Sequence, residues 1–108
     1  MADRTGVSRE RLAVPRDALS PRDAAALGHQ IRTRREELGL TQEDLAEKSG
    51  VTRNQIQVIE RGWADRANRR PANPRLTTLM GLAEALRLQV RIDMTFPTKV
   101  VIEYVADE

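Results

Sequence analysis

The sequence contains no cysteine and only one histidine. Without cysteine the chain offers no disulfide, no thiolate zinc site and no cysteine nucleophile, a composition that suits a reducing compartment. The single histidine, His29, has no carboxylate or cysteine partner at a ligand-like spacing, so a surface histidine is the simpler interpretation. We therefore expect neither a bound metal nor a cofactor.

Long apolar runs and catalytic signatures are also absent. No stretch of about 18 apolar residues could span a bilayer, and the N-terminus lacks the apolar centre of a signal peptide. These absences predict a soluble cytoplasmic protein. Because the sequence has no glycine-rich phosphate loop, no paired catalytic carboxylates and no nucleophile beside a base, we expect no enzymatic activity.

The charges that are present are unevenly distributed. The chain has 108 residues, of which 40% are hydrophobic, enough for one domain with a small core. Its net charge of +2 is too small to indicate a partner by itself. However, residues 51–75 hold six arginines against two acids, whereas residues 76–108 hold three basic residues against five acidic ones. The basic stretch favours a nucleic-acid partner, and a solvated arginine-rich loop is the alternative.

Signals for helix ends begin after residue 19. Residues 1–19 show no sustained apolar period and predict a flexible N-terminal arm. Ser20, followed by a proline, predicts the start of a helix, and Gly39 predicts its end. Apolar residues at helical spacing define one stripe of this helix: Leu27, Ile31 and Leu38.

Two shorter helices follow, each with a capping signal at its start. Thr41 and Asp44 form the first signal, and Thr52 and Gln55 form the second. Both helices end at a glycine that can adopt a positive φ: Gly50 and Gly62. We expect their apolar side chains to face the core: Leu45, Ala46, Ile56 and Ile59.

The pattern changes twice in the remainder of the chain. Residues 62–75 are polar, contain two prolines and show no period, which predicts a loop. Asn73 and Pro74 then predict the start of a fourth helix. Its expected apolar face comprises Leu76, Leu79, Leu82, Ala83 and Leu86. From Leu88 the period is two residues, as in a half-buried strand, and the branched and aromatic residues 100–105 predict a second strand.

The corner between the two short helices has the residues that a helix-turn-helix requires. Ala46 is small where the helices cross closely, Gly50 allows the positive φ of the corner, and Ile56 fills the core under the second helix. A plain helical hairpin would also need small and apolar residues here, and it remains the alternative.

The helix that starts at Arg53 has a polar face suited to reading bases. At about 100° per residue, the side opposite its two isoleucines comprises Asn54, Gln57, Val58 and Arg61, flanked by Arg53 and Gln55. Amide side chains can pair with an adenine edge in the major groove, and arginine can grip guanine or a phosphate. Val58 either meets a thymine methyl or is covered by its neighbours.

The chain resembles the Cro/C1-type (Xre-like) helix-turn-helix family over residues 27–86, most clearly in the segment LGHQIRTRREELGLTQEDLAEKSGVTRNQIQVIERG. The resemblance implies a mainly α, lambda-repressor-like helix-turn-helix bundle of four helices followed by a small C-terminal β strand or hairpin. We accordingly expect a DNA-binding domain over residues 20–87 and a β dimerisation segment over residues 88–108. The implied function is that of a nucleoid-associated bacterial transcriptional regulator. We expect a repressor that binds double-stranded DNA at an inverted-repeat operator as a homodimer.

The resemblance also implies roles for individual residues. Gln42 is similar to the residue that bonds a phosphate and braces the recognition helix. Arg35 and Glu60 match an internal salt bridge, with Arg35 also near the DNA backbone, although a plain surface arginine is the alternative. The remaining implied contacts are base contacts from Arg53, Asn54 and Val58, further candidate contacts from Gln55 and Gln57, and a phosphate contact from Arg61.

Two segments depart from the family pattern. The loop after Gly62 is longer than usual, so any of Arg66, Arg69 and Arg70 is a candidate for contact with DNA, and we expect Trp63 to anchor the loop. The strand from Leu88 resembles that of HipB-like antitoxins, whose strands pair across a dimer.

This strand also bears on the partners of the protein. Its apolar face is too large for one short helix to cover and is the expected dimer interface: Leu88, Val90, Ile92 and Met94. A hairpin folded back on its own helix is the alternative. An antitoxin that autoregulates its operon and neutralises a toxin protein is the second functional interpretation, and a protein-interaction module that does not bind DNA is the third.

Overall fold

The fold was analysed in a computed structural model that describes residues 19–93 and 99–104. Within these residues the helices are α2 (Pro21–Glu37), α3 (Gln42–Ser49), α4 (Arg53–Arg61) and α5 (Leu76–Leu86). The strands are β1 (Trp63–Asp65), β2 (Arg70–Pro71), β3 (Leu88–Asp93) and β4 (Lys99–Tyr104). The expected class, a helical bundle followed by a C-terminal hairpin, is confirmed.

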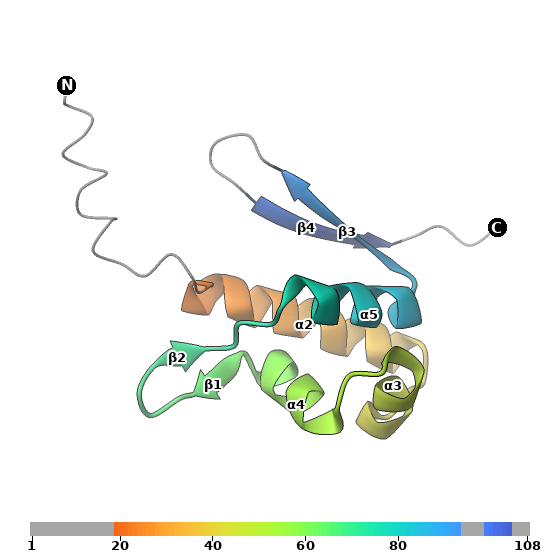
Figure 1. The fold of residues 1–108 in the computed structure, drawn as a ribbon, viewed down its shortest axis with the longest axis horizontal. Coiled ribbons are helices and arrows are strands. Elements are labelled where there is room, and N and C mark those ends of the chain that lie inside the picture. The colour runs from red at the N-terminus through yellow and green to blue at the C-terminus, as the bar shows by residue number, and fades with distance from the viewer. Residues whose placement is uncertain (1–18, 94–98, 105–108) are drawn as a thin grey trace.

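The helices form the body of the molecule, and the two hairpins leave it at different places (Figure 1). Helices α2 and α5 run side by side, α4 packs against α2, and α3 packs against α5. The β3–β4 hairpin lies on the other side of α2 and α5 from α3 and α4. In the part of the chain that the structure describes, no helix combines the length and the apolar character needed to cross a membrane.

The predicted start of α2 and the predicted starts and ends of α3 and α4 are confirmed. The Ser20 hydroxyl accepts a hydrogen bond from the backbone N–H of Asp23 at 3.1 Å. Both α3 and α4 begin with complete capping boxes, in which the side chain of the third helical residue also accepts from the N-cap N–H. Gly50 and Gly62 end these helices at φ of 76° and 83°, in the left-handed region that glycine adopts without steric cost.

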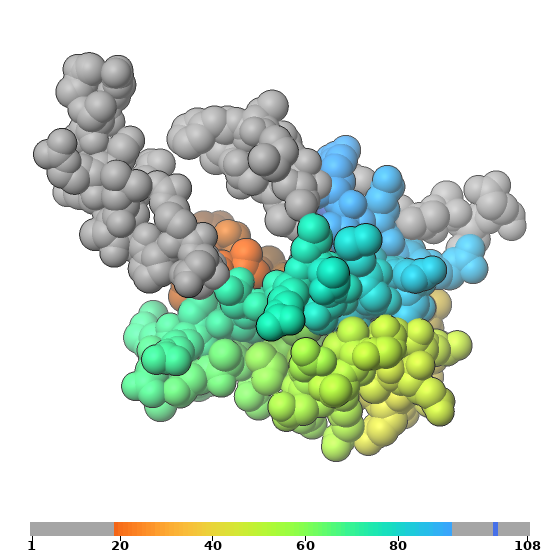
Figure 2. Space-filling model, in the orientation of Figure 1, coloured from red at the N-terminus to blue at the C-terminus, as the bar shows by residue number. Residues whose placement is uncertain are grey.

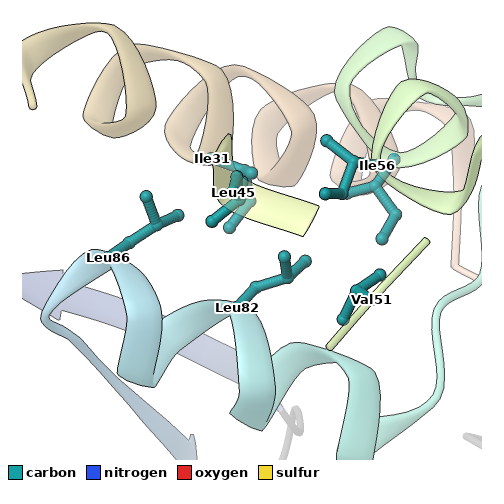
Figure 3. Packing of buried hydrophobic residues seen from close by; sticks show 7 residues of the cluster. Ile31, Leu45, Val51, Ile56, Leu82 and Leu86 are labelled. Atoms are coloured by element: carbon teal, nitrogen blue, oxygen red, sulfur yellow. The ribbon is translucent and has the colours of Figure 1, made fainter. Parts of the chain in front are cut away.

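The core lies where the four helices meet (Figure 3). Its buried side chains are Ile31, Leu45, Val51, Ile56, Ile59, Leu82 and Leu86. The five most fully buried side chains include at least one from each of the four helices. Burial of each contributes about 1.5–3 kcal/mol to the free energy of folding relative to an exposed side chain. Ala46 and Leu88 pack against this core and are partly buried. The prediction that α3 and α4 direct their apolar residues inward is therefore confirmed.

Helices α2 and α4 cross in close contact at Gly28, which is buried. A Cβ atom at this position would overlap the carbonyl oxygen of Ile59 and lie 2.7 Å from the carbonyl oxygen of Glu60. Because both obstacles are backbone atoms, a side chain here would push the two helices apart. Gly28 therefore sets the distance between α2 and α4.

The segment predicted as a loop, residues 62–75, contains a short antiparallel hairpin. Strands β1 and β2 pair Trp63 with Pro71 and Asp65 with Arg70, with an irregularity in register between the two pairs. The strands have three and two residues, too few for an alternating pattern to be visible in the sequence. We call residues 63–71 the basic hairpin, because it contains Arg66, Arg69 and Arg70.

Three expectations about the helices are also wrong in detail. Helix α5 begins at Leu76, after Arg75, and not at Asn73 and Pro74; its N-cap makes no side-chain hydrogen bond. Leu76, expected on the buried face, is 49% exposed because it occupies the first position of the helix. Leu38, expected on the apolar stripe of α2, follows the last helical residue as the C-cap and is 38% exposed.

The predicted C-terminal strands are present and pair with one another. Arg87 ends α5 in the left-handed conformation, at φ of 58°, and β3 starts at the next residue. Strands β3 and β4 pair antiparallel, from Leu88 with Tyr104 to Asp93 with Lys99. Met94 and Val105, which the sequence placed in these strands, lie outside the described residues.

Candidate nucleic-acid interface

Helix α4 presents a polar face to solvent above two buried isoleucines. Ile56 and Ile59 are 0% and 3% exposed, which fixes the side of α4 that faces the core. On the remaining surface Arg53, Asn54, Gln55 and Arg61 are exposed. Gln57 and Val58, expected on the fully exposed side, are half-buried. For Val58 this corresponds to the alternative of a valine partly covered by its neighbours.

An almost buried ion pair fixes the C-terminal half of α4. The Arg35 guanidinium on α2 binds both oxygens of the Glu60 carboxylate on α4, with Nε–Oε2 and Nη2–Oε1 distances of 2.7 and 3.0 Å. The two side chains are 11% and 6% exposed. The hydrogen bond to Glu60 is the main reason that the pKa of Arg35 is raised above its usual value. The predicted salt bridge is therefore present, and it is buried rather than a surface pair.

Helix α3 joins the same network. The side-chain amide of Gln42 donates from Nε2 to Oε1 of Glu60 at 3.1 Å, and Arg35 donates from Nη1 to the carbonyl oxygen of Leu40 at 2.7 Å. Three helices are thus connected at one carboxylate, which holds α4 at a fixed angle to α2 and α3. The Gln42 amide nitrogen carries a second N–H, the group that a phosphate oxygen would accept from.

Some of the candidate base-reading residues already have partners within the chain. Arg53 pairs with Glu43 on α3, at 3.0 Å between Nε and Oε2, but both side chains are more than half exposed, so this ion pair contributes little to stability. Gln55 accepts from the N–H and the hydroxyl of Thr52, both at 3.1 Å, and its amide oxygen is therefore used in the capping box. Glu43 is the member of this surface that the sequence did not indicate.

The basic hairpin continues directly from the end of α4. The Ala72 N–H donates to the carbonyl oxygen of Gly62 at 2.9 Å, and Arg61 donates from Nε to the carbonyl oxygen of Trp63 at 3.0 Å. Trp63 is half-buried, in agreement with its expected role as an anchor of this segment. The hairpin, α4 and α3 together form the lower edge of the molecule in the space-filling view (Figure 2).

Metal and histidine chemistry play no visible part at this surface. Among residues 19–93 and 99–104, no three histidine or acidic side chains lie together in a way that could hold a metal ion. His29 is exposed on α2. The exposed polar side chains along α4 and the basic hairpin are mainly amides and guanidinium groups.

Comparison with known proteins agrees with this geometry. Residues 31–92, more than half of the chain, match the profile of a helix-turn-helix family. A protein of Methanothermobacter thermautotrophicus described as an uncharacterized HTH-type transcriptional regulator is 62% identical over 32 residues, which are 30% of this chain and 46% of that protein. The match thus spans less than half the length of this relative. The chain belongs to the Cro/C1-type, or Xre-like, helix-turn-helix family of DNA-binding transcriptional regulators.

Proposed function

We propose that the protein is a transcriptional repressor that binds an inverted-repeat operator as a homodimer, with α4 as the recognition helix in the major groove. The observation that carries this proposal is the exposed polar face of α4, held rigidly by the buried ion pair between Arg35 and Glu60. A helix with its side chains is about 10–12 Å wide, and the major groove is about 12 Å wide, so α4 can enter it.

Base reading is assigned to residues in the first two turns of α4 that are exposed or half-buried. Asn54, the second residue of the helix, can donate and accept with an adenine, and Arg53 can bind a guanine with two hydrogen bonds. Val58 would meet a thymine methyl, with Gln55 and Gln57 as further contacts. The backbone contacts are assigned to Gln42 and Arg61, with Arg66, Arg69 and Arg70 in the basic hairpin. Arg35, whose guanidinium is held by Glu60 and Leu40, is assigned the role of positioning α4.

Dimerisation is assigned to the C-terminal strands. Leu88 and Val90 are half-buried on β3, and the alternation in the sequence predicts that Ile92 and Met94 continue their apolar face. A two-stranded hairpin is marginal in water on its own, and pairing across a two-fold axis would both cover this face and satisfy a strand edge. The β3–β4 hairpin lies on the other side of α2 and α5 from α3 and α4 in Figure 1, so such a pairing would leave α4 accessible.

An antitoxin is the second candidate function, because α5 leaves two large apolar side chains on the surface. Leu76 and Met80 are 49% and 57% exposed and are four residues apart, so they lie on the same face of the helix. A toxin partner would bury them. The test is co-purification of the product of an adjacent gene. Co-purification that Met80→Lys abolishes, with DNA binding intact, supports the antitoxin role. If no such protein co-purifies, the repressor is the simpler function.

Selection of bound sequences from a random duplex pool, at a stated salt concentration, tests the proposed function. The expected result is an inverted repeat whose half-sites are centred about 34 Å, or one helical turn, apart. Recovery of no enriched sequence contradicts the assignment of α4 as a base-reading helix. Recovery of a single half-site contradicts the dimer.

A further inference from the structure

Arg53 differs from the other residues assigned to base reading, because its side chain is paired with another helix. In the part of the chain that the structure describes, the Arg53 Nε atom lies 3.0 Å from Oε2 of Glu43 on α3. The side chain of Gln55, by contrast, is engaged within the capping box of α4 itself. The two helices of the helix-turn-helix are therefore joined by an ion pair at the surface that carries the base-reading residues.

The stability of α4 does not explain an arginine at this position. Arg53 is the first residue of α4, where the partial positive charge of the helix N-terminus is unfavourable for a cation, and the first turn of α4 contains no acidic residue to offset it. The ion pair with Glu43 is more than half exposed on both sides and contributes little to stability. The position of Arg53 is thus better explained by what its guanidinium can bind.

Glu43 is the acidic residue in the first turn of α3 that capping does not use. The neighbouring carboxylate, Asp44, accepts from the Thr41 N–H at 2.9 Å, and this bond is the main reason that the pKa of Asp44 lies below its usual value. Glu47, one turn further along α3, is exposed and makes no ion pair with the described residues. Of these three carboxylates, Glu43 is the one that meets a base-reading residue.

The geometry of the pair leaves the end of the Arg53 guanidinium open. A guanidinium is a planar fork with five N–H donors, and the Glu43 carboxylate lies beside the Nε edge. The two terminal amino groups, Nη1 and Nη2, remain for a ligand. Guanine presents two acceptors in the major groove, O6 and N7, which these amino groups can bind together, whereas adenine presents one acceptor and one donor.

The carboxylate also changes the preference of Arg53 between bases and phosphates. A guanidinium held by a neighbour loses less conformational freedom when it binds, so its contact with guanine is favoured. A paired arginine also carries less net charge into the interface than an unpaired one, so it is less attracted to the phosphates that every duplex offers. Both effects favour the operator over random DNA.

We infer that Glu43 is a specificity-determining residue, which positions Arg53 for bidentate binding of a guanine and keeps it from binding phosphates. This inference rests on the proposed function of α4 and deepens it. It commits the base pair that faces Arg53 to G·C, and it gives a residue of α3 a part in base preference without any contact of its own with DNA.

The test compares Glu43→Gln with Glu47→Gln, which removes the same charge one turn along α3. The base pair that faces Arg53 is first identified as the one at which Arg53→Ala loses its preference. At that position Glu43→Gln should reduce the preference for guanine over adenine by about two- to tenfold, because Arg53 is no longer held. Glu47→Gln should keep the wild-type preference.

Affinity for random duplex gives a second measurement. With Arg53 free to bind a phosphate, Glu43→Gln should bind random duplex more tightly than Glu47→Gln does. Its slope of log affinity against log salt should also be steeper, by up to about 0.9 per half-site. A general effect of the lost negative charge would be the same in both variants. Equal affinities and slopes for the two variants therefore contradict the suppression of phosphate binding.

A double variant separates positioning from direct reading. In an Arg53→Ala background, Glu43→Gln should cause no further change in base preference, because the side chain that Glu43 positions is absent. If the change in preference persists in this background, Glu43 reads the base itself and the inference is wrong. Melting temperatures of Glu43→Gln and Glu47→Gln should agree, since both carboxylates are exposed.

Two further outcomes overturn the inference and leave the proposed function intact. If Glu43→Gln keeps the full preference for guanine, the ion pair does not position Arg53. If Arg53→Ala loses no preference at any base pair, Arg53 does not read guanine, and α4 reads its site through other residues. In both cases the wild type still selects an operator. Failure of α4 as a recognition helix would appear instead as the absence of any enriched sequence.

Discussion

The helical body, formed by α2 to α5, and the basic hairpin are held together by different kinds of contact. In the body, apolar side chains from all four helices are buried, and a bidentate ion pair connects α2 to α4 away from solvent. In the hairpin, exposed arginines stack on one half-buried tryptophan, and the turn is closed by polar bonds around Asp65. The body can therefore hold α4 in one orientation, while the charge of the hairpin can change without unfolding the protein.

Removal of the carboxylate at the centre of the body should have the largest effect on stability. The Arg35 side chain is 11% exposed in the wild type. In Glu60→Ala its guanidinium would be left buried without a counter-charge. Breaking one partner of such a pair typically costs about 3–5 kcal/mol. The free energy of unfolding in urea measures this loss.

The matched control is Glu36→Ala, which removes an exposed carboxylate paired with Arg32 on the same helix. Its side chain is 56% exposed, and such pairs contribute about 0.3–0.5 kcal/mol. Similar losses for the two variants would contradict the view that the Glu60 network, and not surface charge in general, fixes α4.

Gly28→Ala should produce the next largest loss. The added methyl would overlap the backbone of α4, and overpacking of this kind costs about 1–3 kcal/mol even though alanine favours a helix more than glycine does. Gly81→Ala is the comparison, since the nearest atom to its Cβ would be the Ser49 carbonyl oxygen at 3.1 Å. If calorimetry shows that both substitutions stabilise the protein, the close crossing at Gly28 does not limit the fold.

The β3–β4 hairpin differs from the helical body and the basic hairpin, because its expected partner is another copy of the chain. Val90→Glu puts a charge on the half-buried face of β3, whereas Gln89→Glu puts one on the exposed face next to it. We expect Val90→Glu to weaken the dimer tenfold or more, about 1.4 kcal/mol, in sedimentation equilibrium, with Gln89→Glu close to wild type. A wild-type protein that sediments as a monomer, or a dimer unaffected by Val90→Glu, would refute this interface.

The features that the sequence predicted well are those determined by neighbouring residues. Helix starts at Ser20, Thr41 and Thr52 depend on hydrogen bonds to residues three positions along, and the helix ends at Gly50 and Gly62 depend on one backbone angle. The alternation after Leu88 likewise predicted β3 directly. These signals are local, so they are readable without the fold.

The features that the sequence did not predict depend on what lies across the molecule. Gly28 gives no signal until α4 is known to cross it, and the short strands of the basic hairpin are held by the bond between Ala72 and Gly62, ten residues apart. The start of α5 was misplaced because Arg75 caps it without a side-chain bond. Among the site residues, the resemblance pointed to the Arg35–Glu60 pair but not to its near-complete burial, which follows from the packing of α2 on α4.

Asn54→Ala shows whether the helical body presents α4 to read bases. Asn54 is exposed, so its loss should leave the fold intact. The measurement is the base preference of wild type and variant, selected from the same random duplex pool at the same salt concentration. We predict that Asn54→Ala loses about 1–3 kcal/mol of discrimination at one base pair of each half-site and keeps its affinity for random duplex. An unchanged preference at every position, or an equal loss of affinity for operator and random duplex, would contradict it.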